Sequence, residues 1–266
     1  MSLPTPHPRA RAVITGASSG IGSALAEQLA QQGHSLILVA RREDRLRTLA
    51  DRLANAHAVT VEVRACDLAD RGARAVLADE IRGREISILC NNAGYATYGD
   101  IAELPVAREL RQVELNSVAV HELTLAVLPG MLARKAGAIL ITGSTAGNQP
   151  GPGNATYAAS KAFANTFAES LHGELRGTGV TCTLLAPGPV HTEFGEVAEL
   201  SNLERLLPDP LWVSAETAAA VSLSGASKGK RRVVPGAFAK LQTVGGQYTP
   251  RAVIGPVLRA VYGKAK

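Results

Sequence analysis

A tyrosine and a lysine four residues apart, Tyr157 and Lys161, are the residues whose types and spacing first suggest chemistry. The spacing places both on one face of a helix, with Asn154 and Thr156 as candidate caps. A tyrosine phenol ordinarily titrates at about pH 10, and an ammonium group one turn away favours the phenolate. The pair then suits general acid–base work, although the same spacing also occurs on many solvated helices.

A glycine-rich stretch follows a predicted strand over residues 11–15 and precedes a predicted helix over 21–32. Glycine lets a backbone approach a diphosphate closely, and the N-terminus of the following helix stabilises its charge. The spacing is G-x-x-x-G-x-G, which differs from the common dinucleotide fingerprint. Its place between a strand and a helix favours nucleotide binding over a simple turn. The predicted contacts are Gly16, Ser18, Ser19, Gly20, Ile21 and Gly22.

Two arginines follow the second predicted strand, over residues 35–40. An NAD site usually places an acid here to bond the ribose 2′-hydroxyl, which Ala40 cannot do. Arg41 and Arg42 suit a 2′-phosphate instead, so the sequence favours NADP(H) over NAD(H). The alternative is that both arginines only open a solvated helix with Glu43 and Asp44.

Later strand ends carry further candidates. Asp67 suits either the adenine amino group or a helix N-cap, and Asn91 is expected to tie neighbouring strands together. Asn116 lies in mid-helix, an unfavourable place for asparagine, so it is either a satisfied surface residue or marks a distortion that holds a water. The remaining candidates beside a ribose, a nicotinamide or the reacting group are Asn92, Ala93, Gly94, Ser144, Pro187 and Gly188.

Short apolar runs alternate with helical patterns along the whole chain. The other strands are predicted over residues 59–65, 86–90, 138–142, 180–185 and 233–234, and a long helix over about 105–133. Unbroken apolar strands separated by helices predict a parallel sheet covered on both faces, with ligands beyond the carboxyl ends of its strands. We therefore expect one doubly wound α/β domain over residues 11–266, after a flexible segment over 1–10.

Composition limits the function classes. The net charge of +5 is scattered and aromatics are 4%, which gives nucleic-acid binding little support. The three cysteines lack C-x-x-C spacing, so neither a metal site nor a disulfide is indicated and buried reduced thiols are expected. We expect no signal core and no membrane span, and hence a cytoplasmic protein.

Taken in order, these motifs resemble the short-chain dehydrogenase/reductase family over roughly residues 9–234. Ser144 lies thirteen positions before Tyr157, a spacing typical of that family. The resemblance implies that Tyr157 is the general acid in reduction, that Ser144 polarises the carbonyl, and that Lys161 bonds the nicotinamide ribose. It also implies that Asn116 completes a water-linked proton relay and that Arg41 selects NADP(H). Leu68, Val190 and Thr192 complete the expected cofactor contacts.

The leading hypothesis is an NADP(H)-dependent oxidoreductase acting on a carbonyl or alcohol of an apolar small molecule. One alternative is a 3-oxoacyl thioester reductase, which needs a basic rim for its carrier, and Arg108, Arg111 and Arg134 are the candidates for that rim. The other is a nucleotide-binding regulatory protein, against which the intact Ser144 and Tyr157 argue. Expected pocket walls are Tyr95, Thr145, Gln149, Pro150, Asn154, Phe194 and Trp212, with residues 190–212 as an apolar lid or a packed surface excursion.

The resemblance also implies a homodimer or homotetramer. Four apolar residues on the two central helices, Leu123, Val127, Phe167 and Leu171, exceed what one covered face requires. Near the carboxyl end, Val253, Val257, Leu258 and Val261 mark one face of a helical tail. Packing of that tail on protein is favoured over contact with a membrane surface.

Overall fold

A parallel sheet of seven strands forms the centre of the computed structural model, which describes residues 3–197 and 208–249. Its strand order is β3-β2-β1-β4-β5-β6-β9, and every pairing is parallel. The strands are β1 (Arg11–Thr15), β2 (Leu36–Ala40), β3 (Val61–Ala65), β4 (Ile86–Asn91), β5 (Gly137–Thr142), β6 (Val180–Leu185) and β9 (Arg232–Val233). The predicted doubly wound α/β fold is confirmed, and the predicted strand ends are correct to within two residues.

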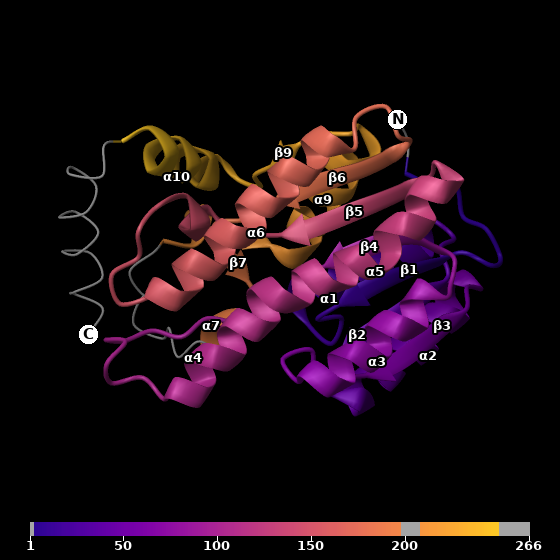
Figure 1. Ribbon diagram of the computed structural model, residues 1–266, viewed down its shortest axis with the longest axis horizontal. Coiled ribbons are helices and arrows are strands. Elements are labelled where there is room, and N and C mark those ends of the chain that lie inside the picture. The colour runs from indigo at the N-terminus through magenta and orange to yellow at the C-terminus, as the bar shows by residue number, and fades with distance from the viewer. Residues whose placement is uncertain (1–2, 198–207, 250–266) are drawn as a thin grey trace.

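Helices cover both faces of the sheet because its inner strands are apolar on both sides. One core cluster joins the sheet to α3 (Arg71–Arg82), α5 (Ala119–Arg134) and α6 (Ala155–Glu174), the helices in front of it in Figure 1. The other joins it to α1 (Gly20–Gln31), α2 (Glu43–His57) and α9 (Ala215–Ser227). The strands point toward the side where α7 (Phe194–Val197) and α10 (Ala237–Tyr248) lie. Parallel sheets of this kind bind their ligands beyond the carboxyl ends of the strands, so we expect the ligand on that side.

Several short elements were not predicted. β7 (Val190–His191) and β8 (Val213–Ser214) pair in a second, two-stranded sheet, and η3 (Asp209–Leu211) precedes β8. Helix α9 begins after an N-cap serine, a start signal that is detectable in the sequence. The Ser214 side chain accepts a hydrogen bond from the Thr217 amide. The predicted lid residues Leu200, Leu206 and Leu207 and the predicted tail helix from Val253 lie outside the described residues.

Three consecutive elements form one continuous helix over Val106–Arg134: α4 (Val106–Val113), η1 (Glu114–Val118) and α5. By length and composition alone this helix is apolar enough to cross a membrane, which corrects the expectation that no stretch approaches a span. Half of its most apolar window is buried inside the protein, as is usual for a core helix packed on a sheet.

The N-terminal segment lies against the fold. Leu3 packs against the core cluster of α1 and α2, and the Arg11 side chain donates a hydrogen bond to the Pro8 carbonyl. The expected flexibility of residues 1–10 stays a prediction.

Candidate active site

A cavity of about 420 Å³ lies beyond the carboxyl ends of the central strands. Ser144, Tyr157 and Lys161 line it, together with every predicted cofactor-contact residue except Gly22. The sheet thus gathers side chains from six separate strand ends at one edge, as the parallel topology requires.

The glycine-rich loop and the first turn of α1 form one end of the cavity. Gly22 lies behind the loop, where an added Cβ would stand 2.1 Å from the Gly16 carbonyl oxygen, so glycine lets α1 pack against the turn. The first turn of α1 carries no acidic residue, and Ser19 makes no side-chain cap, so the helix N-terminus remains available to an anion. These residues fit the diphosphate of a dinucleotide.

Arg41 and Arg42 have different surroundings. The Arg42 guanidinium donates to Ser18 Oγ at 3.0 Å and to Ser19 Oγ at 2.9 Å, and it pairs with Glu193 at 2.7 Å. Glu193 also pairs with Arg45, and these two arginines hold the pKa of its carboxyl below the usual range. Arg41 is exposed, lines the cavity, and forms no ion pair or hydrogen bond with the described parts of the chain. Of the two arginines, Arg41 is therefore the one whose guanidinium no other described residue engages.

Asp67 lines the cavity beyond β3 and is not a helix cap. The cap of α3 is Asp70, whose carboxylate accepts from the Ala73 amide at 2.8 Å. Asp67 accepts from the Ala69 amide at 3.1 Å and pairs with Arg111. Burial raises the pKa of Asp67, but the hydrogen bonds from Arg111 and the Ala69 amide and the positive charges of Arg111 and Arg41 together outweigh it, so the net shift is downward. The carboxylate is thus held ionised at the expected adenine edge.

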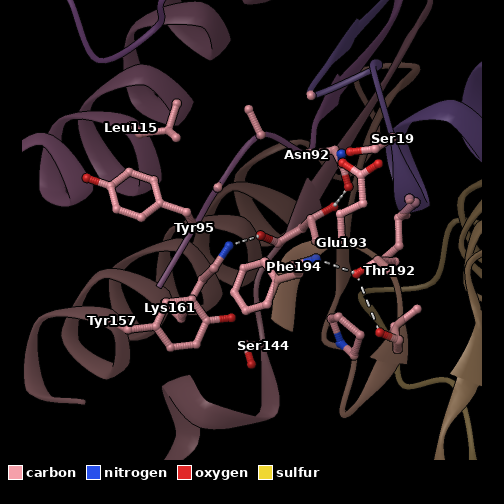
Figure 2. A pocket seen from close by; sticks show the side chains of 18 of the residues that line it. Ser19, Asn92, Tyr95, Leu115, Ser144, Tyr157, Lys161, Thr192, Glu193 and Phe194 are labelled. Atoms are coloured by element: carbon pink, nitrogen blue, oxygen red, sulfur yellow. Dashed lines mark hydrogen bonds between the residues drawn. The ribbon is translucent and has the colours of Figure 1, made fainter. Parts of the chain in front are cut away.

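Tyr157 and Lys161 lie one turn apart on α6, as the spacing predicted. Lys161 Nζ lies 5.8 Å from the centre of the Tyr157 ring and donates to the Thr142 carbonyl at 2.9 Å. Lys161 is only 3% exposed, and burial lowers its pKa to about 8. Figure 2 shows Tyr157, Lys161 and Ser144 gathered in one part of the cavity, with Phe194 beside Tyr157 at a ring separation of 5.8 Å. A desolvated ammonium so close to a phenol favours the phenolate.

Ser144 precedes the short 3-10 turn η2 (Thr145–Asn148), which it caps. Its hydroxyl oxygen accepts from the Ala146 amide at 3.1 Å and donates to no described residue. The hydroxyl proton therefore remains available to an acceptor in the cavity. The main chain of Ser144 is held by Asn165, a residue that sequence analysis missed although it lies four positions after Lys161.

Asn116 lies in the π-helical turn η1, so the predicted helix distortion is confirmed and the surface alternative is wrong. Its buried amide accepts from the Tyr95 amide at 3.2 Å and donates to the Tyr95 carbonyl at 2.9 Å and to Ser160 Oγ at 3.0 Å. An extra residue in a helical turn is a frequent feature of functional sites. The water and proton relay expected at Asn116 stay predictions.

The strand-to-strand tie expected of Asn91 was assigned to the wrong residue. Asn91 donates to Val120 and Thr124 of α5. Asn92 makes the tie, because its amide donates to the Thr15 carbonyl of β1 and accepts from Thr142 of β5.

The substrate end is apolar on several sides. Tyr95, Thr145, Phe194 and Trp212 line it as predicted, and Tyr98 and Leu115 also line it although they were not predicted. Gln149 and Asn154 do not line the cavity. Asn154 is buried and donates to the Thr97 carbonyl at 2.7 Å, which also explains why its side chain does not cap α6. Gln149 lies against Gly246 of α10.

Residues 10–201 match the short chain dehydrogenase family. The chain belongs to the short-chain dehydrogenase/reductase family. Members of this family are oxidoreductases that act on CH–OH groups with NAD(P).

Individual members of the family are similar over most of this chain. A sulfoacetaldehyde reductase from Chromohalobacter salexigens is 40% identical over 186 residues, which cover 68% of this chain and 73% of the relative. A very-long-chain 3-oxoacyl-CoA reductase from Anas platyrhynchos is 35% identical over 71% of this chain, and the match spans only 62% of the relative's length. The solved structure of a Sphingobium yanoikuyae short-chain dehydrogenase in complex with NADPH is 31% identical, with a TM-score of 0.78 over 96% of this chain and 94% of that one.

Proposed function

We propose that this short-chain dehydrogenase/reductase transfers hydride between NADP(H) and the carbonyl or alcohol of an apolar small molecule. The observation that carries the proposal is the arrangement of one cavity. Tyr157, Lys161 and Ser144 meet in it near an apolar wall, and the same cavity extends to the glycine-rich loop and to Arg41, which pairs with no other described residue. When bound, the nicotinamide supplies or accepts the hydride.

Each polar side chain then has a separate task in reduction. The Tyr157 hydroxyl gives a proton to the carbonyl oxygen, on which negative charge develops. The Ser144 hydroxyl donates a hydrogen bond to the same oxygen. Lys161 stabilises the phenolate that remains, because its buried charge is screened little by water. Asn116 holds the Tyr95 backbone beside this group from the π-helical turn.

The substrate class follows from the walls of the cavity. Tyr98, Leu115, Phe194 and Trp212 provide apolar surface. The charged Asp67 and Arg111 also line the cavity, but they pair with one another. A neutral, apolar carbonyl compound therefore fits better than a charged one.

A 3-oxoacyl thioester is the second candidate, and one relative bears the name of such a reductase. The basic rim it needs has little support, because Arg111 pairs with Asp67 and Arg134 donates to the Ile86 carbonyl at the opposite edge of the sheet. NADPH oxidation with a panel of apolar ketones, aldehydes and 3-oxoacyl thioesters tests both candidates. Turnover of the thioesters alone would overturn the leading proposal, and turnover of none would favour the non-catalytic alternative.

Cofactor choice depends on Arg41. We expect Arg41→Ala to weaken NADPH binding by about 1.5–3 kcal/mol and to leave NADH binding nearly unchanged, because only NADPH carries a 2′-phosphate. Fluorescence titration of both cofactors measures this difference. Arg47→Ala, which removes an exposed arginine paired with Glu43 on α2, is the control for a general loss of positive charge. Equal weakening of both cofactors by Arg41→Ala would refute the assignment.

We also propose that the chain forms a homodimer or homotetramer through α5 and α6. Three of the four apolar residues first chosen as support were wrong, because Leu123, Val127 and Leu171 are buried in the chain's own core, whereas Phe167 is only partly buried. Other apolar side chains are exposed instead, namely Leu125 and Leu132 on α5, Phe163 on α6 and Val118 at the end of η1, directly before α5. This leaves an apolar surface of the kind that marks interfaces.

Light scattering at micromolar concentration should give the mass of two or four chains. Leu125→Glu should reduce that mass to one chain, because Leu125 is 52% exposed on α5 and a charge there opposes burial. Val76→Glu is the matched control, since Val76 is 72% exposed on α3. A wild-type monomer, or equal effects of both variants, would contradict the proposed surface.

A cytoplasmic location stays a proposal. Its support is that Cys66, Cys90 and Cys182 are buried free thiols. Burial raises the pKa of Cys90 and of Cys182 to about 12, so both stay protonated and unreactive. Cell fractionation with an antibody to the protein checks the location.

A further inference from the structure

Asn165 continues the helix face that carries the candidate acid and base. Tyr157, Lys161 and Asn165 follow one another at four-residue intervals on α6. Asn165 is 3% exposed and does not line the cavity. Its amide nevertheless makes three hydrogen bonds, all to the turn that presents Ser144.

Those three bonds hold both ends of η2. Asn165 Oδ1 accepts from the Ser144 amide at 3.3 Å, and Nδ2 donates to the Ser144 carbonyl at 2.9 Å. Nδ2 also donates to Asn148 Oδ1 at 3.2 Å, at the last residue of the turn. The Asn165 side chain therefore holds the backbone of Ser144, which caps the turn, and the side chain of Asn148, which ends it.

The amide can take only one orientation here. The Ser144 amide only donates and the Ser144 carbonyl only accepts. Asn148 Oδ1 also faces the Arg232 guanidinium, which only donates, at 3.4 Å, and Arg232 is paired with Glu169 of α6. Donors and acceptors thus agree at both atoms of the Asn165 amide, which makes its geometry rigid.

Helix α6 therefore holds the end of β5 at two points. Lys161 Nζ bonds the Thr142 carbonyl and Asn165 bonds Ser144, on either side of Gly143. The approach is so close that a Cβ on Gly143 would stand 1.9 Å from Asn165 Oδ1. The same helix carries Tyr157, so the place of Ser144 relative to Tyr157 is set by α6.

We propose that Asn165 is a positioning residue for Ser144, and that its amide keeps the Ser144 hydroxyl aimed at the oxygen to which Tyr157 delivers its proton. This rests on the proposed function, in which Ser144 and Tyr157 act on one carbonyl oxygen. A displacement of about 1 Å at a reacting group lowers rates by up to about 100-fold. Asn165→Ala should accordingly lower kcat by about 10- to 100-fold and leave the Kd of NADPH unchanged.

A double-mutant cycle with Ser144→Ala tests the proposal, because a residue that acts only through Ser144 has no effect once the Ser144 hydroxyl is gone. We expect Asn165→Ala to leave kcat unchanged in the Ser144→Ala background. A fall in kcat by the same factor in both backgrounds would overturn the proposal, since it would show a structural role only. Ser144→Ala alone reports separately on the proposed function, which fails if that variant keeps full kcat.

Two further variants guard against misfolding. Asn165→Asp keeps the size of the side chain, but its carboxylate repels the Ser144 carbonyl and Asn148 Oδ1, so kcat should fall while circular dichroism stays that of the wild type. Asn91→Ala removes another buried amide, one bonded to Val120 and Thr124 of α5, and should lower stability without lowering kcat. A folded Asn165→Asp variant with full kcat, or an Asn91→Ala variant with a matching loss of kcat, would also overturn the proposal.

Discussion

Tyr157→Phe should lower kcat by at least about 10²–10⁴, the factor that a positioned acid or base contributes. The substitution keeps the ring that packs beside Phe194 and removes only the hydroxyl. NADPH binding should change little, because Lys161 and the glycine-rich loop remain. Steady-state kinetics with the best carbonyl substrate, together with NADPH titration, measures both quantities.

Tyr248→Phe is the matched control for Tyr157→Phe, since Tyr248 is an exposed tyrosine on α10, outside the cavity. It should leave kcat at the wild-type value. If Tyr157→Phe also keeps wild-type turnover, Tyr157 is a structural residue of α6 and the acid–base assignment must be withdrawn. Thermal unfolding of both variants should stay close to that of the wild type, which separates loss of chemistry from loss of fold.

Ser144→Ala should lower kcat by about 10²–10³, which is the usual cost of removing one donor to a developing oxyanion. The affected step is the same as for Tyr157→Phe, because both hydroxyls are proposed to serve one oxygen. The variant also loses the hydrogen bond from the Ala146 amide, which should cost about 0.5–2 kcal/mol of stability. Kinetics on folded protein separates the two effects.

Ser214→Ala removes an equivalent cap from α9, where Ser214 accepts from the Thr217 amide at 3.1 Å outside the cavity. It should lower the free energy of unfolding by a similar amount and leave kcat intact. Equal losses of kcat in the two variants would mean that Ser144 acts as a helix cap alone.

The sequence by itself determined the architecture and most of the cavity lining. Apolar runs, glycine spacing and residues such as Ser144 at strand ends are local features, and the topology of a parallel sheet brings all strand ends to one edge. That is why the sequence alone places residues from Gly16 to Thr192 at one ligand site, and they line one cavity in the structure. The helix distortion at Asn116 was also detectable, because asparagine in mid-helix conflicts with local propensity.

Only the tertiary structure decided which of two similar residues does which task. Arg41 and Arg42 are indistinguishable in sequence, but Glu193, far along the chain, pairs with Arg42, and no residue within 3–197 or 208–249 pairs with Arg41. Leu123 was predicted to be a surplus apolar residue, but its side chain packs in the core, whereas Leu125 on the same helix is exposed. The role of Asn165 became visible only in the structure, where this residue of α6 bonds to Ser144 at the end of β5. Side-chain hydrogen bonds and burial depend on contacts between distant segments, and local periodicity and propensity carry no information about those contacts.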